Sequence, residues 1–205
     1  MSETIGIYGG TFDPPHIGHL ILAGEALAQL ALTRLLWIPA PEPPHKTGYP
    51  ITPLRHRLEM LRRLVAGLPG FEISTVETDR PGPHYTVDTL EILGKQFPTA
   101  DLVLLLGGDS LRDLPTWHRP HDVLAACRFV GVMRRPGTPF DMDVLEGFFP
   151  GLGAKTRFID APQIDVSSSL IRKRVAMGGH YRYYLTPEVY TYIEENKLYS
   201  SPTSK

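Results

Sequence analysis

The sequence has few of the features that mark a secreted, membrane-bound or nucleic-acid-binding chain. It contains one cysteine, Cys127, so no disulfide can form within the chain, and we expect a reducing, cytoplasmic setting. No stretch approaches the ~20 apolar residues of a membrane span, and the N-terminus has no basic segment followed by a long apolar run. The formal net charge is −1, so no overall field favours nucleic acid or a membrane. Any site for an anionic ligand must therefore be built locally.

The composition is that of an ordinary globular chain. Its 205 residues are 42% hydrophobic and 21% charged, which provides a sizeable core without disulfides. We expect one domain over residues 1–199 and a disordered tail over 200–205, which reads SSPTSK. Cys127 lies in the apolar stretch AACRFVGVM, which favours a small buried side chain over a catalytic thiol.

Apolar periodicity predicts strands that alternate with helices. Short apolar or alternating runs predict strands at 5–8, 35–40, 71–77, 101–110, 128–133 and 156–160. Spacings of three and four residues predict helices from Ile17 onward and at 53–66, 86–96, 167–177 and 186–199. We expect Thr86 and Thr186 to cap two of these helices, and Ser167 to cap a third. The segment 41–50 contains four prolines and a glycine, which predicts a loop.

This order of elements predicts a doubly wound α/β fold with a mainly parallel sheet and a small C-terminal helical part. Continuous apolar strands such as LVLLL are typical of a parallel sheet that is covered on both faces. Ligands of such sheets bind beyond the carboxyl ends of the strands. The segments expected there hold most of the unusual chemistry in the sequence: GGTFDPPHIGH, PEPPHK, GGDS, MRRPG and DVSSS.

The first of these segments, GGTFDPPHIGH at 9–19, predicts an anion site at the start of a helix. A helix N-terminus presents free N–H groups and about half a positive charge. The segment is not a P-loop, because G-x-x-x-x-G-K-[ST] is absent from it. It is not a dehydrogenase fingerprint either, because G-x-G-x-x-G is absent and the second strand ends in IPA without an acid.

His16 and His19 take the place of the lysine that a P-loop would use. They are three residues apart in the first helical turn, so they share a face and can donate to phosphate oxygens. Gly18 between them leaves room for a ligand to approach. Two other interpretations remain open from these residues alone. The histidines can be half-buried residues of a helix, or they can bind zinc together with Asp13, although no third ligand has a recognisable spacing.

Seven segments together resemble a known family. GGTFDPPHIGH resembles the signature of nucleotidyltransferases that carry an H-x-G-H motif on a Rossmann-like fold. The other six follow in the order typical of bacterial nicotinate mononucleotide adenylyltransferases: PPHK at 43–46, GPHYTVDTL at 82–90, LLLGGDSLRDLPTWHRP at 104–120, RRPG at 134–137, VSSSLIR at 166–172 and LTPEVYTYIEENKLY at 185–199. The resemblance runs from about residue 4 to residue 199.

The resemblance implies an ATP site that lies between two segments, GGTFDPPHIGH and VSSSLIR. It implies phosphate binding and catalysis by His16, His19 and Arg172. Backbone and hydroxyl contacts to ATP are implied for Gly9, Gly10, Thr11, Phe12, Gly107, Asp109, Ser168 and Ser169. From its position alone, Asp109 after a buried strand can also be the N-cap of a helix at 110–114.

For the pyridine nucleotide the resemblance implies contacts from Lys46, Tyr85, Thr86, Asp109, Trp117 and Arg134, with Arg135 as the alternative to Arg134. Trp117 stands among polar neighbours in TWHRP, which favours an exposed indole that stacks on the pyridine ring over a packing role. His84 replaces the serine that the family usually has before Tyr85, and Ser169 replaces a threonine.

The reaction implied is adenylyl transfer from ATP to nicotinate mononucleotide, with Mg²⁺ bound mainly by phosphates and water. The expected partners are these two substrates, without nucleic acid or membrane, and a homo-oligomer stays open. Three alternatives remain: another adenylyl- or cytidylyltransferase of the superfamily that acts, for example, on phosphopantetheine; a metal-dependent hydrolase that uses His16, His19 and Asp13; and a non-catalytic nucleotide sensor.

Overall fold

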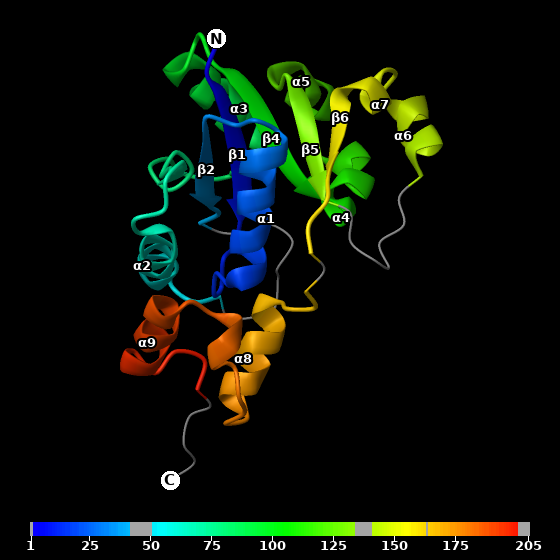
Figure 1. Ribbon diagram of the computed structural model, residues 1–205. Coiled ribbons are helices and arrows are strands. Elements are labelled where there is room, and N and C mark those ends of the chain that lie inside the picture. Colours follow the sequence, from blue (N-terminus) through cyan, green and yellow to red (C-terminus); the bar gives the residue numbers. More distant parts are fainter. Residues whose placement is uncertain (1, 42–50, 134–140, 163, 201–205) are drawn as a thin grey trace.

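The computed structural model describes residues 2–41, 51–133, 141–162 and 164–200. Within these residues, six parallel strands form one sheet in the order β3-β2-β1-β4-β5-β6 (Figure 1). The strands are β1 (Thr4–Gly10), β2 (Arg34–Pro39), β3 (Phe71–Ile73), β4 (Asp101–Gly107), β5 (Phe129–Met133) and β6 (Thr156–Ile159). The predicted doubly wound parallel sheet is confirmed.

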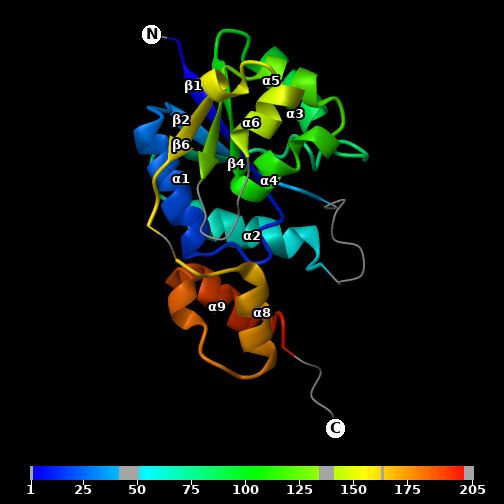
Figure 2. The same cartoon turned by 90° about the vertical axis from the view of Figure 1, so that its right-hand side faces the viewer.

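Helices cover both faces of this sheet. The larger ones are α1 (Ile17–Gln29), α2 (Leu54–Val65), α3 (Thr86–Gln96), α8 (Ser168–Ala176) and α9 (Pro187–Glu195). Shorter ones are α4 (Gly108–Arg112), α5 (Pro120–Ala126), α6 (Met142–Phe148) and α7 (Leu152–Lys155), with 3₁₀ turns η1 (Leu114–Thr116) and η2 (Arg182–Tyr184). Figure 2 shows α8 and α9 together as a layer beside the sheet domain, which confirms the predicted C-terminal helical part.

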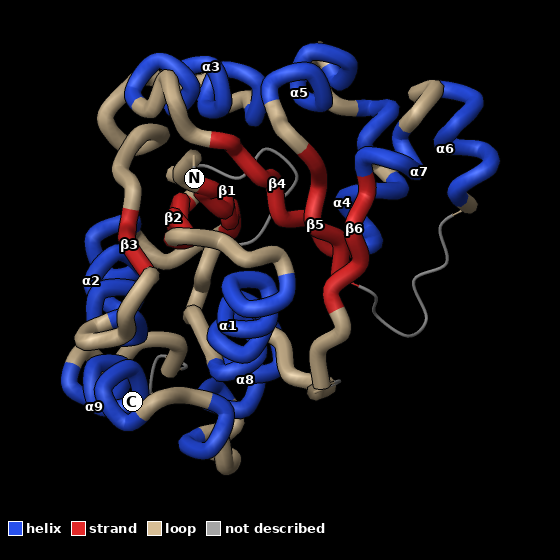
Figure 3. Tube along the Cα trace, turned by 45° about the horizontal axis from the view of Figure 1, so that its top comes forward, coloured by secondary structure: helices blue, strands red, loops and turns tan. Residues whose placement is uncertain are grey.

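The alternation of side chains along the strands divides the core into two layers. Leu35 and Trp37 of β2 point to one face, where they pack with residues of α1, α2, α8 and α9. Leu36 and Ile38 point to the other face, where they pack with α3, α4 and α5. Figure 3 shows α1 and α2 on one side of the strands and α3 and α5 on the opposite side. Cys127 is 3% exposed in the second layer, as expected of a buried side chain.

The strand order places a topological switch point between β1 and β4. From β1 the chain builds outward to β2 and β3, and it then returns to the other side of β1 as β4. The register pairs Thr4 with Asp101 and Ile7 with Leu104, so its continuation brings the ends of the two strands, Gly10 and Gly107, level with each other. Ligands of open α/β sheets bind at such a point.

Several element boundaries differ from the predicted ones. β1 continues through Gly9 and Gly10 rather than ending before them. β3 ends at Ile73, although the alternating pattern of the sequence continues to residue 77. The chain turns there instead, because the Thr75 hydroxyl donates to Asp79 at 2.6 Å. The last helix ends at Glu195, before residues Lys197 and Tyr199, which have φ angles of 51° and 64°.

Helix caps agree with the sequence only in part. Ser167 is the N-cap of α8, and its hydroxyl accepts the Leu170 N–H at 3.1 Å, as predicted. Thr186 occupies the N-cap position of α9 without a side-chain capping bond. Thr86 is the first helical residue of α3, and Tyr85 is the N-cap.

Across the described residues, no helix has the length and apolar character that crossing a membrane requires.

Candidate active site

Glycines at the carboxyl ends of β1 and β4 leave the backbone there accessible to a ligand. A Cβ atom added at Gly9 or at Gly107 would meet no atom within 4 Å, so both backbones border open space. A Cβ at Gly10 would lie 2.7 Å from the Phe12 ring, so this position is restricted to glycine. The switch point therefore has bare backbone where a ligand can approach closely.

Phe12 turns the chain from β1 toward α1. Its φ angle is 50°, and its side chain is 2% exposed. The ring packs edge-on against His19, with centroids 5.2 Å apart, and against Trp37 at 5.4 Å. Only the backbone of Phe12 can therefore face a ligand, and a backbone contact is what the resemblance implies. The ring of Phe12 packs against His19.

The two histidines form one stacked unit at the start of α1. Their ring centroids are 3.7 Å apart, with an angle of 29° between the planes. His16 is the N-cap of the helix and is 4% exposed. Its backbone N–H donates to Nδ1 of His19 at 3.2 Å. Because Nδ1 is an acceptor here, a neutral His19 ring carries its proton on Nε2, which makes Nε2 a hydrogen-bond donor.

Gly18 makes room for a neighbouring side chain, a role that the sequence analysis did not predict. A Cβ at this position would lie 3.0 Å from Nδ1 and 3.1 Å from Cε1 of His16, so the glycine makes room for a histidine ring. The same Cβ would lie 3.9 Å from the carbonyl oxygen of Val166, the residue before the N-cap of α8. The N-termini of α1 and α8 therefore converge, and both bring the partial positive charge that attracts phosphate.

Side chains of α8 hold the loop that leads into α1. The Ser168 hydroxyl donates to the Pro14 carbonyl at 2.8 Å. Nη1 of Arg172 donates to the Asp13 carbonyl at 2.7 Å, and its Nη2 donates to the Ser169 hydroxyl at 3.2 Å. The structure thus brings Ser168, Ser169 and Arg172 to the histidine segment. The first-turn N–H groups of α8 and further guanidinium N–H groups can donate to an anion.

Asp13 is an anchor of this loop rather than a metal ligand. It is 3% exposed, and its carboxylate accepts the Tyr199 hydroxyl at 2.7 Å and the Thr52 N–H at 3.2 Å. Burial and the neighbouring carboxylate raise the pKa of Tyr199, so its hydroxyl remains a donor. Among the described residues, no group of three or more His, Cys, Asp or Glu side chains could hold a metal ion. The zinc interpretation is therefore wrong for Asp13.

Arg57 is a buried cation behind the same loop, and the sequence analysis missed it. It is 1% exposed, and burial lowers its pKa, an effect that Asp13 partly offsets. Its guanidinium donates to four backbone carbonyls at 2.8–2.9 Å: those of Thr11, Ala40, Pro41 and Thr52. The spacing of Arg57 with Met60, Leu61 and Leu64 on the buried face of α2 is the signal that could have revealed it.

The residues after β4 are arranged differently from the prediction. Asp109 is exposed in the first turn of α4, 3.8 Å from Arg112, and Gly107 rather than Asp109 is the N-cap. Trp117 is half-buried and packs against the second core layer, so only part of its indole is exposed. An exposed aromatic pair stands nearby instead: the ring of Tyr85, at the start of α3, stacks on His118 with centroids 4.1 Å apart.

The segment before α3 is fixed by charged side chains. Arg80 donates to the Pro83 carbonyl at 2.9 Å, and the Thr89 hydroxyl donates to Glu77 at 2.8 Å. Burial raises the pKa of Glu77. These contacts hold Tyr85 and the helix start in place. Lys46, Arg134 and Arg135, which are also predicted to contact the substrates, lie outside the described residues.

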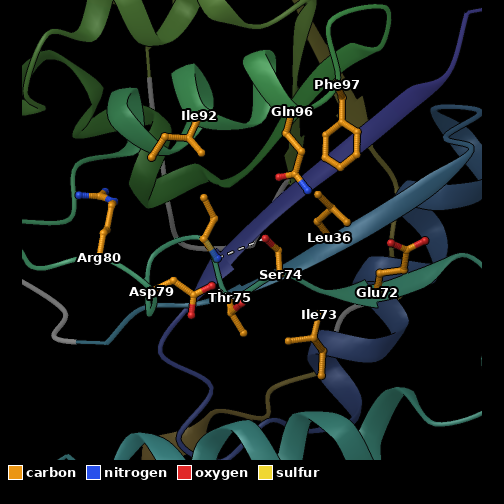
Figure 4. A pocket seen from close by; sticks show the side chains of 11 residues that line it. Leu36, Glu72, Ile73, Ser74, Thr75, Asp79, Arg80, Ile92, Gln96 and Phe97 are labelled. Carbon is orange, nitrogen blue, oxygen red and sulfur yellow. Dashed lines mark hydrogen bonds between the residues drawn. The ribbon is translucent and has the colours of Figure 1, made fainter.

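A cavity of about 470 Å³ lies on the flank of α3, beside this site rather than in it (Figure 4). None of the predicted site residues lines it. Two of its acidic groups already have partners, because Glu72 pairs with Arg34 at 3.0 Å and Asp79 accepts the Thr75 hydroxyl.

Comparisons with known proteins agree with this geometry. A family model described as cytidylyltransferase-like matches residues 7–174. A probable nicotinate-nucleotide adenylyltransferase of Thermomicrobium roseum is 46% identical over 195 residues, which cover 95% of this chain and 91% of that protein. The nicotinate-nucleotide adenylyltransferase of Bacillus subtilis is 39% identical over 199 residues, which cover 97% of this chain and 100% of that protein.

Solved structures share the fold. The nicotinic acid mononucleotide adenylyltransferase of Plasmodium falciparum, in complex with NaAD, superposes with a TM-score of 0.76 at 20% identity and covers 96% of this chain and 97% of its own. That structural likeness supports the fold, and the sequence relatives match over nearly the whole chain. The chain belongs to the cytidylyltransferase-like family and, within it, to the nicotinate-nucleotide adenylyltransferases.

Proposed function

We propose that this chain transfers the adenylyl group of ATP to nicotinate mononucleotide, giving nicotinate adenine dinucleotide and pyrophosphate in NAD biosynthesis. The observation that carries the proposal is the stacked His16–His19 pair where the N-termini of α1 and α8 converge. Such a site attracts and orients phosphates. The names of the sequence relatives point to the same reaction.

The chemistry needs alignment and charge neutralisation more than proton transfer. A phosphate oxygen of nicotinate mononucleotide attacks the α-phosphorus of ATP, a new P–O bond forms there, and the bond to the bridging oxygen of pyrophosphate breaks. A phosphate monoester has a second pKa of about 6, so the nucleophile is already anionic near neutral pH. The protein therefore acts by holding two anions in line.

His19 and Arg172 are suited to that task. The contact between the His16 N–H and Nδ1 orients the His19 ring, and Nε2 is the ring nitrogen that can donate to a phosphate oxygen. The contact of Arg172 with the Asp13 carbonyl fixes its guanidinium before ATP binds. Donors that are held in place beforehand stabilise charge in the transition state without reorganisation.

The metal is part of the substrate in this proposal. ATP enters with Mg²⁺, which phosphate oxygens and water coordinate. The described residues offer no cluster of carboxylates or histidines that would hold the ion on its own. Its contribution is to neutralise charge on the triphosphate.

The pyridine nucleotide binds between the end of β4 and the start of α3 in this proposal. N–H groups in the first turn of α3 suit its carboxylate, and Asp109 accepts from ribose hydroxyls. The half-buried Trp117 and the exposed Tyr85–His118 pair supply aromatic surface for the pyridine ring. Lys46 and Arg134 remain predicted phosphate contacts. We place the reaction in the cytoplasm, where Cys127 stays reduced.

The test is substrate comparison with the purified chain. Pyrophosphate release and dinucleotide formation are measured for ATP with nicotinate mononucleotide, with nicotinamide mononucleotide and with phosphopantetheine, and CTP replaces ATP in a parallel series. We expect the highest kcat/KM for ATP with nicotinate mononucleotide. A higher value with phosphopantetheine or with CTP would assign the chain to another branch of the family, and nucleotide binding without any product would make it a sensor.

A further inference from the structure

We propose that Tyr199 is a positioning residue for the ATP site, because its hydroxyl fixes Asp13 in the loop that carries the two histidines. The inference rests on the proposed function, since it treats this loop as the one that holds ATP phosphates. Tyr199 is separated from Asp13 by 186 positions in sequence, and its contact joins the last described segment to the first loop of the fold.

The contact satisfies a buried charge. Asp13 is 3% exposed, and its carboxylate accepts from the Tyr199 hydroxyl at 2.7 Å and from the Thr52 N–H at 3.2 Å. A buried carboxylate that loses one of its donors keeps an unsatisfied oxygen and shifts toward water or another donor. The Tyr199 hydroxyl therefore helps to determine where Asp13 lies.

The position of Asp13 affects both sides of the site, namely the side chains of α8 and the start of α1. Its carbonyl accepts from Arg172, and the carbonyl of the next residue, Pro14, accepts from Ser168. Two residues later, His16 begins the stacked histidine pair. A displacement of Asp13 thus moves the anchor of the guanidinium and the start of α1 together.

The C-terminal segment places the Tyr199 hydroxyl beside Asp13. Helix α9 packs against α2, where Tyr192 contacts Nδ1 of His56 at 2.9 Å. Beyond the helix, Lys197 and Tyr199 adopt φ angles of 51° and 64°, which turn the chain back toward the loop. Figure 1 shows the C-terminal segment beside α8, on the side of the sheet toward which the strands point.

The chain offers a matched control. Tyr192→Phe removes a tyrosine hydroxyl that is hydrogen-bonded between α9 and α2 but does not contact the loop. Tyr199→Phe removes one that does. Both substitutions delete a single oxygen atom and keep the ring, so a general loosening of the helical layer would affect both variants alike.

The experiment measures ATP binding and turnover for the wild type and the two variants. Binding is followed with a non-hydrolysable ATP analogue in the presence of Mg²⁺, and kinetics give separate KM values for ATP and for nicotinate mononucleotide. We expect Tyr199→Phe to weaken the analogue and to raise the KM for ATP by about tenfold, which corresponds to about 1.4 kcal/mol. Its KM for nicotinate mononucleotide is expected to match that of Tyr192→Phe.

Two results would overturn the inference: equal ATP affinity in both variants, or an equal rise of both KM values in Tyr199→Phe. Failure of the proposed function looks different. In that case the wild type binds the analogue but forms no dinucleotide, and the ratio of analogue affinities between the two variants still decides whether Tyr199 positions the loop.

Discussion

Replacing Gly18 with alanine is expected to lower kcat/KM by about tenfold or more, because the new methyl group displaces a catalytic histidine. The added Cβ would lie 3.0 Å from Nδ1 and 3.1 Å from Cε1 of His16. Comfortable contacts lie near 3.5–4.0 Å, so the ring must move by roughly 0.5 Å. His16 is buried and stacked on His19, so the displacement passes to the second ring. A misplacement of about 1 Å costs on the order of 100-fold in rate, and half of it about tenfold.

Gly24→Ala on the same helix is the control. A Cβ at Gly24 meets nothing within 4 Å, so alanine there should stabilise the fold by about 0.5–1 kcal/mol and leave the rate unchanged. At Gly18 the same helical gain opposes an overpacking cost of about 1–3 kcal/mol, so a small net loss of stability is expected. Urea unfolding and steady-state pyrophosphate release measure the two effects. Wild-type kcat/KM in Gly18→Ala would refute the reasoning.

Two further predictions concern the second substrate and the core. Trp117→Ala is expected to raise the KM for nicotinate mononucleotide by about tenfold and to change the KM for ATP little, since stacking on a base contributes about 1–3 kcal/mol. An equal change in both KM values would instead indicate a packing role. Burial raises the pKa of Cys127 to about 12, so iodoacetamide should not modify the native protein at mildly alkaline pH and should modify it after unfolding. Rapid labelling of the native protein would contradict the burial of this thiol.

The sequence predicts those parts of the site that depend on local chemistry. The glycine turn, the position of His16 and His19 in the first turn of α1, and the Ser167 cap all follow from residue types within a few positions of one another. The parallel sheet and a site beyond the carboxyl ends of its strands follow from apolar patterning and the rules for such sheets, whereas the strand order that places β1 beside β4 is seen only in the structure.

Contacts between distant segments could not be predicted in the same way. The pairing of Tyr199 with Asp13 and the four carbonyls around Arg57 depend on how α2 and the C-terminal helices pack against the first loop. Trp117 shows the limit of local context, because its polar neighbours indicate exposure while its ring packs against core residues of other elements. The purpose of Gly18 likewise appears only when the His16 ring is in place.

The central claim is that His19 acts as a donor to phosphate and not as a base, and one measurement tests it directly. Rates of nicotinate adenine dinucleotide formation are compared for the wild type, His19→Gln and His19→Ala. Glutamine keeps an N–H donor near the position of Nε2 but cannot accept a proton as a base. We predict that alanine lowers kcat by about 100-fold to 1,000-fold, as expected when one stabilising donor is lost, and that glutamine restores much of this loss. Glutamine that is as inactive as alanine, or alanine that is as active as the wild type, would contradict the account.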